Sequence, residues 1–403
     1  MRRYGDMRIR KFVALIPLVL IGCGGSDAPE SGADSPRGVT DDTIVIGSHT
    51  DLSGGLATWG VPASNGMRMR FEEANEAGGI HGRQIEFIVE DSQYQMPVAV
   101  KATNKLLNVD RIFLMVGSMG TPMNIALMPR MFEAGVPSLF PLTAAVQMHE
   151  PLHPMKFNYF VSYRDQIRGG MTHMIGKHGF QKVCLQYVAS DYGHENAVGF
   201  DQAVEELGLE VVYRGQHKGA ETDFVGTITA IKNSGCEMLV LGPLVKDTIL
   251  IYSTARDAGW EAPIISNMVS YVPEVAAAAD GVTDGLYASA SFYVPDFELE
   301  LAAGSWAGEW GLRFLRRFGE EPAPQAVIGY IEGDLVVRAL QHAGPDLTVN
   351  KVLAALESIS NYEDPFGGPS LSFSPTKHQG GDYLTLYQVQ NSRWEIVEKN
   401  IPF

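Results

Sequence analysis

The chain has few of the features that mark several large classes of protein. It is 403 residues long and contains only three cysteines, so it is not a small domain held together by disulfide bonds. Charged residues make up 19% of it, and beyond the N-terminus they form no basic patch of the kind that binds nucleic acid. The formal net charge of −16 comes from scattered acids, which is typical of a solvated surface. We therefore expect no nucleic-acid partner.

Motifs of enzyme chemistry are also missing. The sequence contains no GxxxxGK[ST] phosphate loop, no HExxH or CxxC pair and no GxSxG elbow. His149 and His153 have the spacing of a helical metal pair, but Pro151 between them breaks such a helix, so both are expected in a loop. We expect no catalytic activity, no metal and no other cofactor.

Long apolar runs are absent as well. The longest candidate, residues 12–21, is too short for a transmembrane helix, which needs ~20 apolar residues. It follows five basic residues in 1–11 and precedes Leu20-Ile21-Gly22-Cys23, an arrangement typical of a secretory signal. The stretch LIGC resembles the lipobox of bacterial lipoproteins, which implies a signal peptide over 1–23 and a lipid on Cys23. A plain secretory peptide is the alternative, and retention at the inner or outer membrane stays open.

Residues 24–41 are rich in Gly, Ser, Pro and acids, which predicts a flexible tether behind the lipid. The other two cysteines, Cys184 and Cys236, lie on or beside apolar strand-like runs. Export permits a disulfide bond, but bridging neighbouring strands of a parallel sheet is geometrically awkward. The sequence therefore favours two buried thiols, with a disulfide as the alternative.

From Thr43 onward, short β-branched runs alternate with segments of helical periodicity. Strands are expected at 43–48, 84–90 and 112–117, and the pattern restarts after residue 163 with strands that include 182–188 and 237–242. Such repeated strand–helix–strand units predict an α/β protein with two parallel sheets covered by helices. Two long helices, 301–318 and 325–343, and a hairpin around Asn391-Ser392 follow.

The stretch Ala77–Ile85, AGGIHGRQI, carries a specific resemblance. Within EANEAGGIHGRQIEFIVEDSQY it is similar to the signature of periplasmic solute-binding proteins of the branched-chain amino acid (leucine/isoleucine/valine-binding) ABC transporter type. The resemblance continues in VGSMGTP, VPSLFPLTAA and SDYGHENAVGFDQAVEELGLEV, and covers nearly all of 43–340 in family order. It implies a type I periplasmic-binding fold, with two doubly wound parallel-sheet lobes joined by a three-crossover hinge.

The same resemblance implies the organisation and partners of the protein. One lobe would contain residues 42–163 plus 290–380, and the other 164–289 plus 381–403. A small-molecule ligand would sit between the lobes. The partner would be an ABC permease in the inner membrane, served by a monomer in the periplasm or cell envelope that touches the membrane through its lipid anchor only.

Three turns that follow predicted strands of the first half should meet at one sheet edge, where α/β proteins bind ligands. These turns are 51–59, 117–121 and 141–145. Thr121 opens a helix, and helix N-termini suit a carboxylate, although Thr121 is equally an ordinary helix cap. The resemblance implies that Gly120, Thr121, Thr143 and Ala144 hold the carboxylate of the ligand.

Further binding residues are implied on both sides of the cleft. Trp59 matches an aromatic that covers the ligand in the family, and a core tryptophan is the alternative. Tyr192 matches a tyrosine that the second lobe contributes, and a surface tyrosine is the alternative. The second lobe would add Asn267 and Met268, and its surface, which also includes Leu244, Val245 and Tyr271, is apolar.

One departure from the family concerns the ligand's ammonium group. Amino-acid binders of this type carry an acid after the strand that matches 263–266, whereas residues 266–271 here read SNMVSY. An ammonium buried without a partner would cost several kcal/mol. The ligand therefore stays open between an amino acid, a deaminated acid, an aromatic acid and an amide. We expect an exported binding lipoprotein for an ABC importer, with a ligand sensor that signals to a membrane receptor or regulator as the alternative.

Overall fold

The computed structural model describes residues 36–403 of the chain. The predicted signal peptide, the lipidation site Cys23 and most of the tether lie outside these residues. Within 36–403, no helix combines the length and the apolar character that a membrane crossing requires.

The first sheet is parallel throughout and has the strand order β2-β1-β3-β4-β5. In β1 and β2, Thr43 lies opposite Gln84 and the register runs unbroken to Thr50 opposite Asp91. We call the part of the chain built on this sheet the first lobe. Its strands are β1 (Thr43–Thr50), β2 (Gln84–Asp91), β3 (Leu114–Val116), β4 (Ser138–Leu139) and β5 (Lys156–Phe157).

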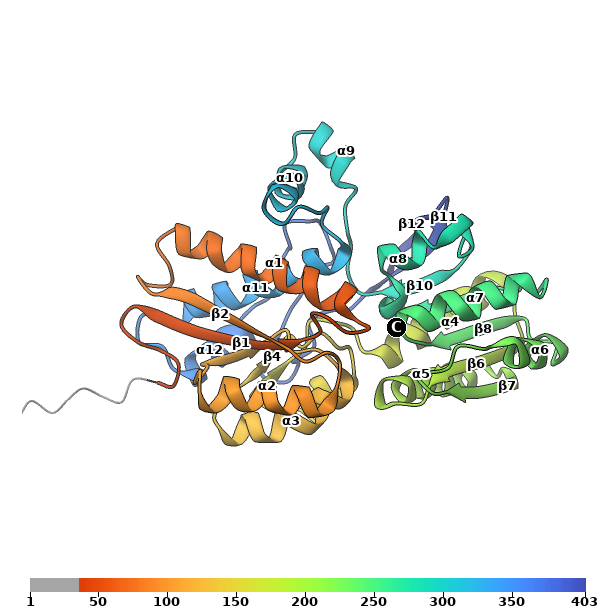
Figure 1. The fold of residues 1–403 in the computed structure, drawn as a ribbon, viewed down its shortest axis with the longest axis horizontal. Coiled ribbons are helices and arrows are strands. Elements are labelled where there is room, and N and C mark those ends of the chain that lie inside the picture. Colours follow the sequence, from red (N-terminus) through yellow and green to blue (C-terminus); the bar gives the residue numbers. More distant parts are fainter. Residues whose placement is uncertain (1–35) are drawn as a thin grey trace, which may run out of the picture. The chain divides into compact units, whose positions relative to one another are not determined.

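Helices from both ends of the chain cover this sheet. In Figure 1, α1 (orange) and α11 (blue) lie side by side although they are far apart in sequence. Gly66 and Gly329 permit this approach, because a Cβ at either position would come within 2.0 Å of a backbone oxygen of the facing helix. The helices of this lobe are α1 (Ala57–Glu76), α2 (Met96–Asn108), α3 (Thr121–Glu133), η1 (Val146–Met148), α9 (Phe297–Ala302), α10 (Trp306–Phe318), α11 (Pro324–Ala343) and α12 (Val349–Glu357).

The single helix predicted over 301–318 is in fact two. Helix α9 ends before Gly304, which has a left-handed φ of 69°, and α10 begins after Ser305. The Ser305 hydroxyl accepts a hydrogen bond from the Gly308 amide and so caps the new helix. A Gly-Ser pair at a helix boundary explains the break.

The second sheet has the order β12-β11-β10-β9-β8-β6-β7. Strands β6 to β10 are parallel, the first strand of the terminal hairpin, β11, pairs antiparallel with β10, and β12 pairs antiparallel with β11. Asn391 and Ser392 both have left-handed φ angles, as a tight two-residue hairpin loop requires. We call this part the second lobe. Its strands are β6 (Lys182–Val188), β7 (Glu210–His217), β8 (Met238–Gly242), β9 (Ile264–Asn267), β10 (Tyr287–Ala290), β11 (Leu384–Gln390) and β12 (Arg393–Ile401).

The helices of the second lobe, green in Figure 1, pack against this sheet. They are α4 (Tyr163–His178), α5 (Asp191–Leu207), α6 (Val225–Asn233), α7 (Val245–Asp257), η2 (Met268–Ser270), α8 (Pro273–Ala276) and η3 (Ala279–Gly281).

Three crossing segments connect the lobes and form the hinge. The Asn158 amide donates to the His378 carbonyl at 2.8 Å, and the Gly380 amide donates back to the Asn158 carbonyl at 2.9 Å. The Val161 amide donates to the Ser291 hydroxyl at 3.1 Å, which joins the crossing segment that contains Ser291 to the one that contains Asn158 and Val161. The fold is therefore the predicted α/β type I periplasmic-binding architecture, with two parallel-sheet lobes and a three-crossover hinge.

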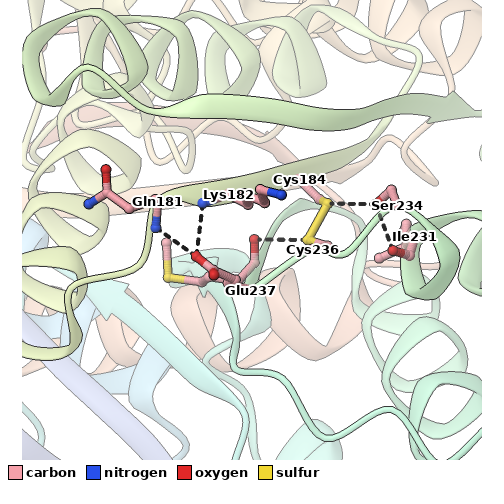
Figure 2. The surroundings of a disulfide bond; sticks show 8 residues. Gln181, Lys182, Cys184, Ile231, Ser234, Cys236 and Glu237 are labelled. Atoms are coloured by element: carbon pink, nitrogen blue, oxygen red, sulfur yellow. Dashed lines mark hydrogen bonds between the residues drawn. A yellow bond between two sulfur atoms is a disulfide. The ribbon is translucent and has the colours of Figure 1, made fainter.

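The prediction of two free thiols is wrong, because Cys184 and Cys236 form a disulfide bond (Figure 2). Their Cα atoms are 6.0 Å apart, within the usual range for such bonds. Cys184 lies on β6, whereas Cys236 lies in the turn that leads into β8. The bond therefore joins a strand to a turn, and the difficulty of bridging two parallel strands does not arise. Nearby, the Glu237 carboxylate accepts the amides of Gln181 and Lys182 and fixes the same turn.

Candidate functional site

A cavity lies between the two lobes, at the carboxyl ends of the first sheet's strands. Loops after β1, β2, β3 and β4 form one wall, and the second lobe forms the other. The walls approach closely and leave a cavity volume of about 30 Å³. The cavity is lined by Leu56, Trp59, Tyr94, Met119, Gly120, Thr121, Leu142, Thr143, Tyr163, Tyr192, Leu244, Met268 and Val269.

The loop after β1 is held by two carboxylates. Asp51 is fully buried and accepts the amides of Gly54 at 2.5 Å and Leu56 at 2.8 Å. Asp91, at the end of β2, accepts the Leu52 amide at 2.9 Å and the Ser53 hydroxyl at 2.6 Å. These bonds fix the entry into α1, and the first turn of that helix then places Leu56 and Trp59 in the cavity wall.

Trp59 lies where the sequence places a ligand-covering aromatic. Its ring lines the cavity and is only 4% exposed. Its Nε1 donates to the Val269 carbonyl at 3.3 Å, so this side chain also connects the first lobe to the second. The sequence left open whether Trp59 is a core residue or part of the cavity wall. Trp59 is both, because it is almost fully buried and also lines the cavity.

The loop after β3 depends on glycine. Gly120 has a φ of 99°, and a Cβ there would lie 2.8 Å from the Met123 sulfur and 3.0 Å from the Tyr94 ring. Asn124 clamps the loop from inside, because its Nδ2 donates to the carbonyls of Ser118 at 2.9 Å and Gly120 at 3.0 Å. Only glycine fits this position, where the backbone comes up against an aromatic wall.

Thr121 is the first residue of α3 and meets Thr143 from the neighbouring loop. Their hydroxyl oxygens are 2.7 Å apart, and the Leu142 amide donates to the Ser118 carbonyl at 2.9 Å, so the two loops are tied together. Amides in the first turn of a helix have no carbonyl partner within the helix and carry a partial positive charge. The arrangement suits a small anion such as a carboxylate.

Ala144, predicted beside this group, does not line the cavity. It is fully buried, and its carbonyl accepts the Tyr163 amide at 2.8 Å. Ala144 therefore positions the start of α4 and, with it, the Tyr163 ring.

Three tyrosines contribute to the walls. The rings of Tyr163 and Tyr192 meet edge to face with centroids 4.8 Å apart. Burial raises the pKa of Tyr163 to about 12, and it also raises the pKa values of Tyr94 and Tyr192 above the usual value. All three phenols are therefore neutral at physiological pH and contribute no charge to the cavity.

The second-lobe wall is apolar and comes from Leu244, Met268 and Val269. The backbone of Met268 is fixed by Gln166, a fully buried residue that does not line the cavity, because the Met268 amide donates to Gln166 Oε1 at 3.1 Å. Val245 and Tyr271, which the sequence grouped with this surface, are not among the lining residues.

Asn267, a predicted ligand-binding residue, lies behind Tyr192 and does not line the cavity. Its Nδ2 donates to the Tyr192 hydroxyl at 3.0 Å, and its Oδ1 accepts the Val269 amide at 2.8 Å. The Tyr192 hydroxyl in turn donates to the Pro243 carbonyl at 2.9 Å. The polar end of Tyr192 is thus satisfied within the protein, and Asn267 holds that ring in place.

None of the thirteen lining side chains is charged. The nearby acids are engaged elsewhere. Asp51 accepts loop amides, and Glu195 accepts from Arg164 at 2.7 Å, from the Gln147 amide group at 2.8 Å and from the Val146 amide at 3.2 Å. The described walls therefore offer hydroxyls, helix amides and apolar surface. Among residues 36–403, no cluster of side chains has the make-up of a metal site.

The sequence reasoning missed two lining tyrosines. Tyr94 follows β2, whereas the predicted first-lobe wall included only the turns after β1, β3 and β4. Extending the same rule to β2 would have found it, since all parallel strands end at this edge. Tyr163 begins α4 directly after the first crossing segment, and no sequence pattern distinguishes a hinge residue that faces the cavity from one that faces away.

Comparison with known proteins supports this architecture. The family model described as "Periplasmic binding protein" matches residues 43–393. A Pseudomonas aeruginosa protein named "Amino acid binding protein" is 26% identical over 59% of this chain and 64% of its own length. A leucine-, isoleucine-, valine-, threonine- and alanine-binding protein from the same organism is 24% identical over 62% of this chain and 66% of its own. The chain thus spans just under two thirds of these relatives.

Solved structures show the same fold. A fatty acid ABC transporter substrate-binding protein from Thermomonospora curvata has a TM-score of 0.80, with 22% identity over 93% of this chain and 96% of that one. A branched-chain amino acid ABC transporter protein from Thermus thermophilus with bound valine has a TM-score of 0.79, with 19% identity over 90% and 96%. A solute-binding protein from R. palustris in complex with benzoate has a TM-score of 0.77, with 19% identity over 89% and 97%.

The resemblance in the sequence to solute-binding proteins of the branched-chain amino acid type is thereby confirmed. Since the family model spans most of the chain, the protein belongs to the periplasmic binding protein family.

Proposed function

We propose that this protein is an exported solute-binding lipoprotein that captures a small carboxylate-bearing molecule and delivers it, chemically unchanged, to an ABC importer. The observation that carries the proposal is the cavity itself. Both lobes wall it, and the N-terminus of α3 with the Thr121–Thr143 hydroxyl pair lies at its first-lobe side. The relatives named for amino-acid binding and the structures named for ABC transporters support the same reading.

Within the site, each group has a distinct role in the proposal. The amide of Thr121 and the hydroxyls of Thr121 and Thr143 receive the carboxylate, with the glycine backbone at Gly120 giving access. Trp59 and Met268 cover the body of the ligand from opposite lobes. Tyr192 adds an apolar ring face, while Ala144 and Asn267 act by positioning Tyr163 and Tyr192.

Capture requires movement of the lobes. A cavity volume of about 30 Å³ holds only a few water molecules, so a solute of amino-acid size enters when the walls separate. The three hinge segments allow a rotation of the lobe of residues 42–163 and 290–380 against that of 164–289 and 381–403. Closure around the ligand then presents a distinct shape to a permease.

The membrane attachment belongs to the same proposal. Lipid on Cys23 and the tether that follows it hold a monomer at the cell envelope, within reach of its permease. The last residues of the predicted 24–41 tether already pack on the first lobe, where Val39 is buried and the Gly38 carbonyl accepts the Val45 amide at 2.8 Å. Replacing Cys23 by Ala should abolish incorporation of radiolabelled palmitate and release the protein from the membrane fraction. Palmitate incorporation into the Cys23→Ala protein would contradict the assignment of the lipid to this residue.

Identification of the natural solute tests the proposal directly. The protein is purified under native conditions, denatured, and the released small molecules are identified by mass spectrometry. Each candidate is added back, and the melting temperature is measured, since a ligand that binds only the folded state raises it by mass action. Chemical conversion of the released compound on incubation with the protein would overturn the proposal of a pure binding role.

A further inference from the structure

The side chains that line the cavity restrict the charge that its ligand can carry. The cavity lining includes no Asp or Glu side chain. Of the acids close to it, Asp51 and Glu195 accept hydrogen bonds from protein donors, and Asp191 is exposed at the start of α5. A cation placed in this cavity would therefore find no carboxylate in its walls. Transfer of an ammonium group from water into such a site is strongly unfavourable.

Neutral acceptors do not replace the missing acid. The Tyr192 hydroxyl is engaged by Pro243 and Asn267, and the Thr143 hydroxyl oxygen accepts the Ala145 amide at 3.3 Å besides its bond to Thr121. One hydroxyl of the threonine pair donates to the other, so the pair keeps one free O–H donor, which suits a carboxylate better than an ammonium. A primary ammonium presents three N–H donors that each require an acceptor. The aromatic faces attract cations weakly, but they supply no lone pair for these donors.

The proposed position of the carboxylate at the N-terminus of α3 also disfavours an ammonium group. In an α-amino acid the ammonium is bonded one carbon away from the carboxylate. A carboxylate held at the N-terminus of α3 therefore places the ammonium close to the positive end of the same helix. That end stabilises the anion and repels the cation, and no acidic residue occurs in the first turn of α3 to offset the effect.

From these observations we propose that the ligand is a monocarboxylate with an uncharged, apolar body, and that the site discriminates against α-amino acids. This rests on the proposed function and specifies its substrate class. The carboxylate lies at Thr121 and Thr143, and the body lies among Leu56, Trp59, Leu244 and Val269. Selectivity arises from the missing counter-charge in the second-lobe wall.

The decisive test compares pairs of compounds that differ only in the ammonium group. The protein is stripped of bound solute by denaturation and refolding, and its recovered fold is checked by circular dichroism. Titration calorimetry then measures 4-methylpentanoate against leucine and 3-phenylpropanoate against phenylalanine. We expect each deaminated acid to bind about 100-fold more tightly than its amino acid, or more.

A charge introduced into the wall gives a second readout. Leu244 precedes α7 at its N-cap, makes no capping bond and faces the cavity, so a polar residue there is compatible with folding. Leu244→Glu should improve leucine binding at least about tenfold and weaken 4-methylpentanoate binding, because the new carboxylate pairs with the ammonium. Leu244→Gln, of the same size without charge, is the control and should not improve leucine binding.

The outcomes separate this inference from the proposed function. Leucine binding as tightly as 4-methylpentanoate, or more tightly, overturns the inference and leaves the carboxylate-binding function in place. If the refolded protein binds no member of either pair, capture of small carboxylates fails and the inference fails with it.

Discussion

At the scale of single residues, the proposed carboxylate site depends on the contact between Thr121 and Thr143. The Thr121 hydroxyl adds a donor beside the free amide of the same residue at the start of α3. Replacing it by Val keeps the branched shape and removes that donor. Because a hydrogen bond to a charged group is worth about 1.5–3 kcal/mol, Thr121→Val should weaken carboxylate binding about tenfold or more.

Titration calorimetry with 4-methylpentanoate measures this effect. Thr121→Ser, which retains the hydroxyl, serves as the matched variant and should bind nearly as the parent does. Equal affinities for the parent and the Val variant would place the carboxylate elsewhere in the cavity.

His49 provides a second prediction at this scale. It is fully buried at the end of β1, and neither ring nitrogen has a hydrogen-bond partner among the described residues. Burial lowers the pKa of His49 from 6.5 to about 4. The unfolded chain therefore takes up a proton as pH falls through 6.5, whereas the folded protein does so only near pH 4. This contribution to stability is complete above pH 6.5 and declines by up to about 3 kcal/mol as pH drops to 4.

Denaturant unfolding at several pH values between 7 and 4.5 measures this dependence. His49→Leu removes the group and should flatten the fall in the free energy of unfolding over this range. His149, whose pKa burial also lowers to about 4, remains in both proteins and contributes equally to both curves. Parallel curves for parent and variant would show that His49 titrates alike in the folded and unfolded states.

At the scale of elements, the alternation of strand and helix patterns was sufficient to predict both sheets. It worked because each β-branched run had to bury both faces, which only a parallel sheet covered by helices provides. The meeting of the turns that carry Thr121 and Thr143 was predictable for the same reason, since turns after parallel strands lie at one edge, whereas their role as ligand residues came from the family resemblance. The direction in which a side chain points within such a turn was not predictable. Asn267 and Met268 are neighbours in sequence, yet only Met268 reaches the cavity, because Asn267 still belongs to β9 and points toward Tyr192.

The disulfide bond was not the favoured alternative because the prediction treated the pair as a bridge between neighbouring parallel strands. The loop it closes spans a separation of 52 residues and contains α5, β7 and α6. In the chain-entropy description, a cross-link of that length stabilises the folded state by about 4 kcal/mol. We expect the double variant Cys184→Ala, Cys236→Ala to lose about this amount in denaturant unfolding while its ligand affinity stays unchanged, since neither residue lines the cavity.

The reduced parent protein is the control for that variant. It lacks the cross-link but keeps both side chains, so it separates lost chain constraint from lost packing. Equal unfolding free energies for the oxidised and reduced parent would contradict a stabilising role for the bond.

At the scale of the whole molecule, a small number of polar contacts holds the lobes together. Gln325, at the start of α11, donates to the Tyr271 carbonyl at 3.0 Å, and Trp59 donates to the Val269 carbonyl at 3.3 Å. Glu195 on α5 is the charged member of this set. It accepts from Val146 and Gln147 of the first lobe while paired with Arg164 of its own. With so few contacts, the balance between closed and open forms is sensitive to each.

Glu195→Ala removes two of these bridging contacts at once and should shift the ligand-free protein toward the open form. Small-angle X-ray scattering should then show a larger radius of gyration without ligand, which returns to the parent value at saturating ligand. Affinity should fall in proportion to the loss of the closed population.

Glu206→Ala is the matched control, because Glu206 lies on the same helix but pairs only with Arg168 of its own lobe. An unchanged radius in Glu195→Ala, or an equal change in Glu206→Ala, would show that Glu195 does not hold the lobes together. A selective change would instead mean that ligand affinity in this protein is set partly outside the cavity, by how much closure costs.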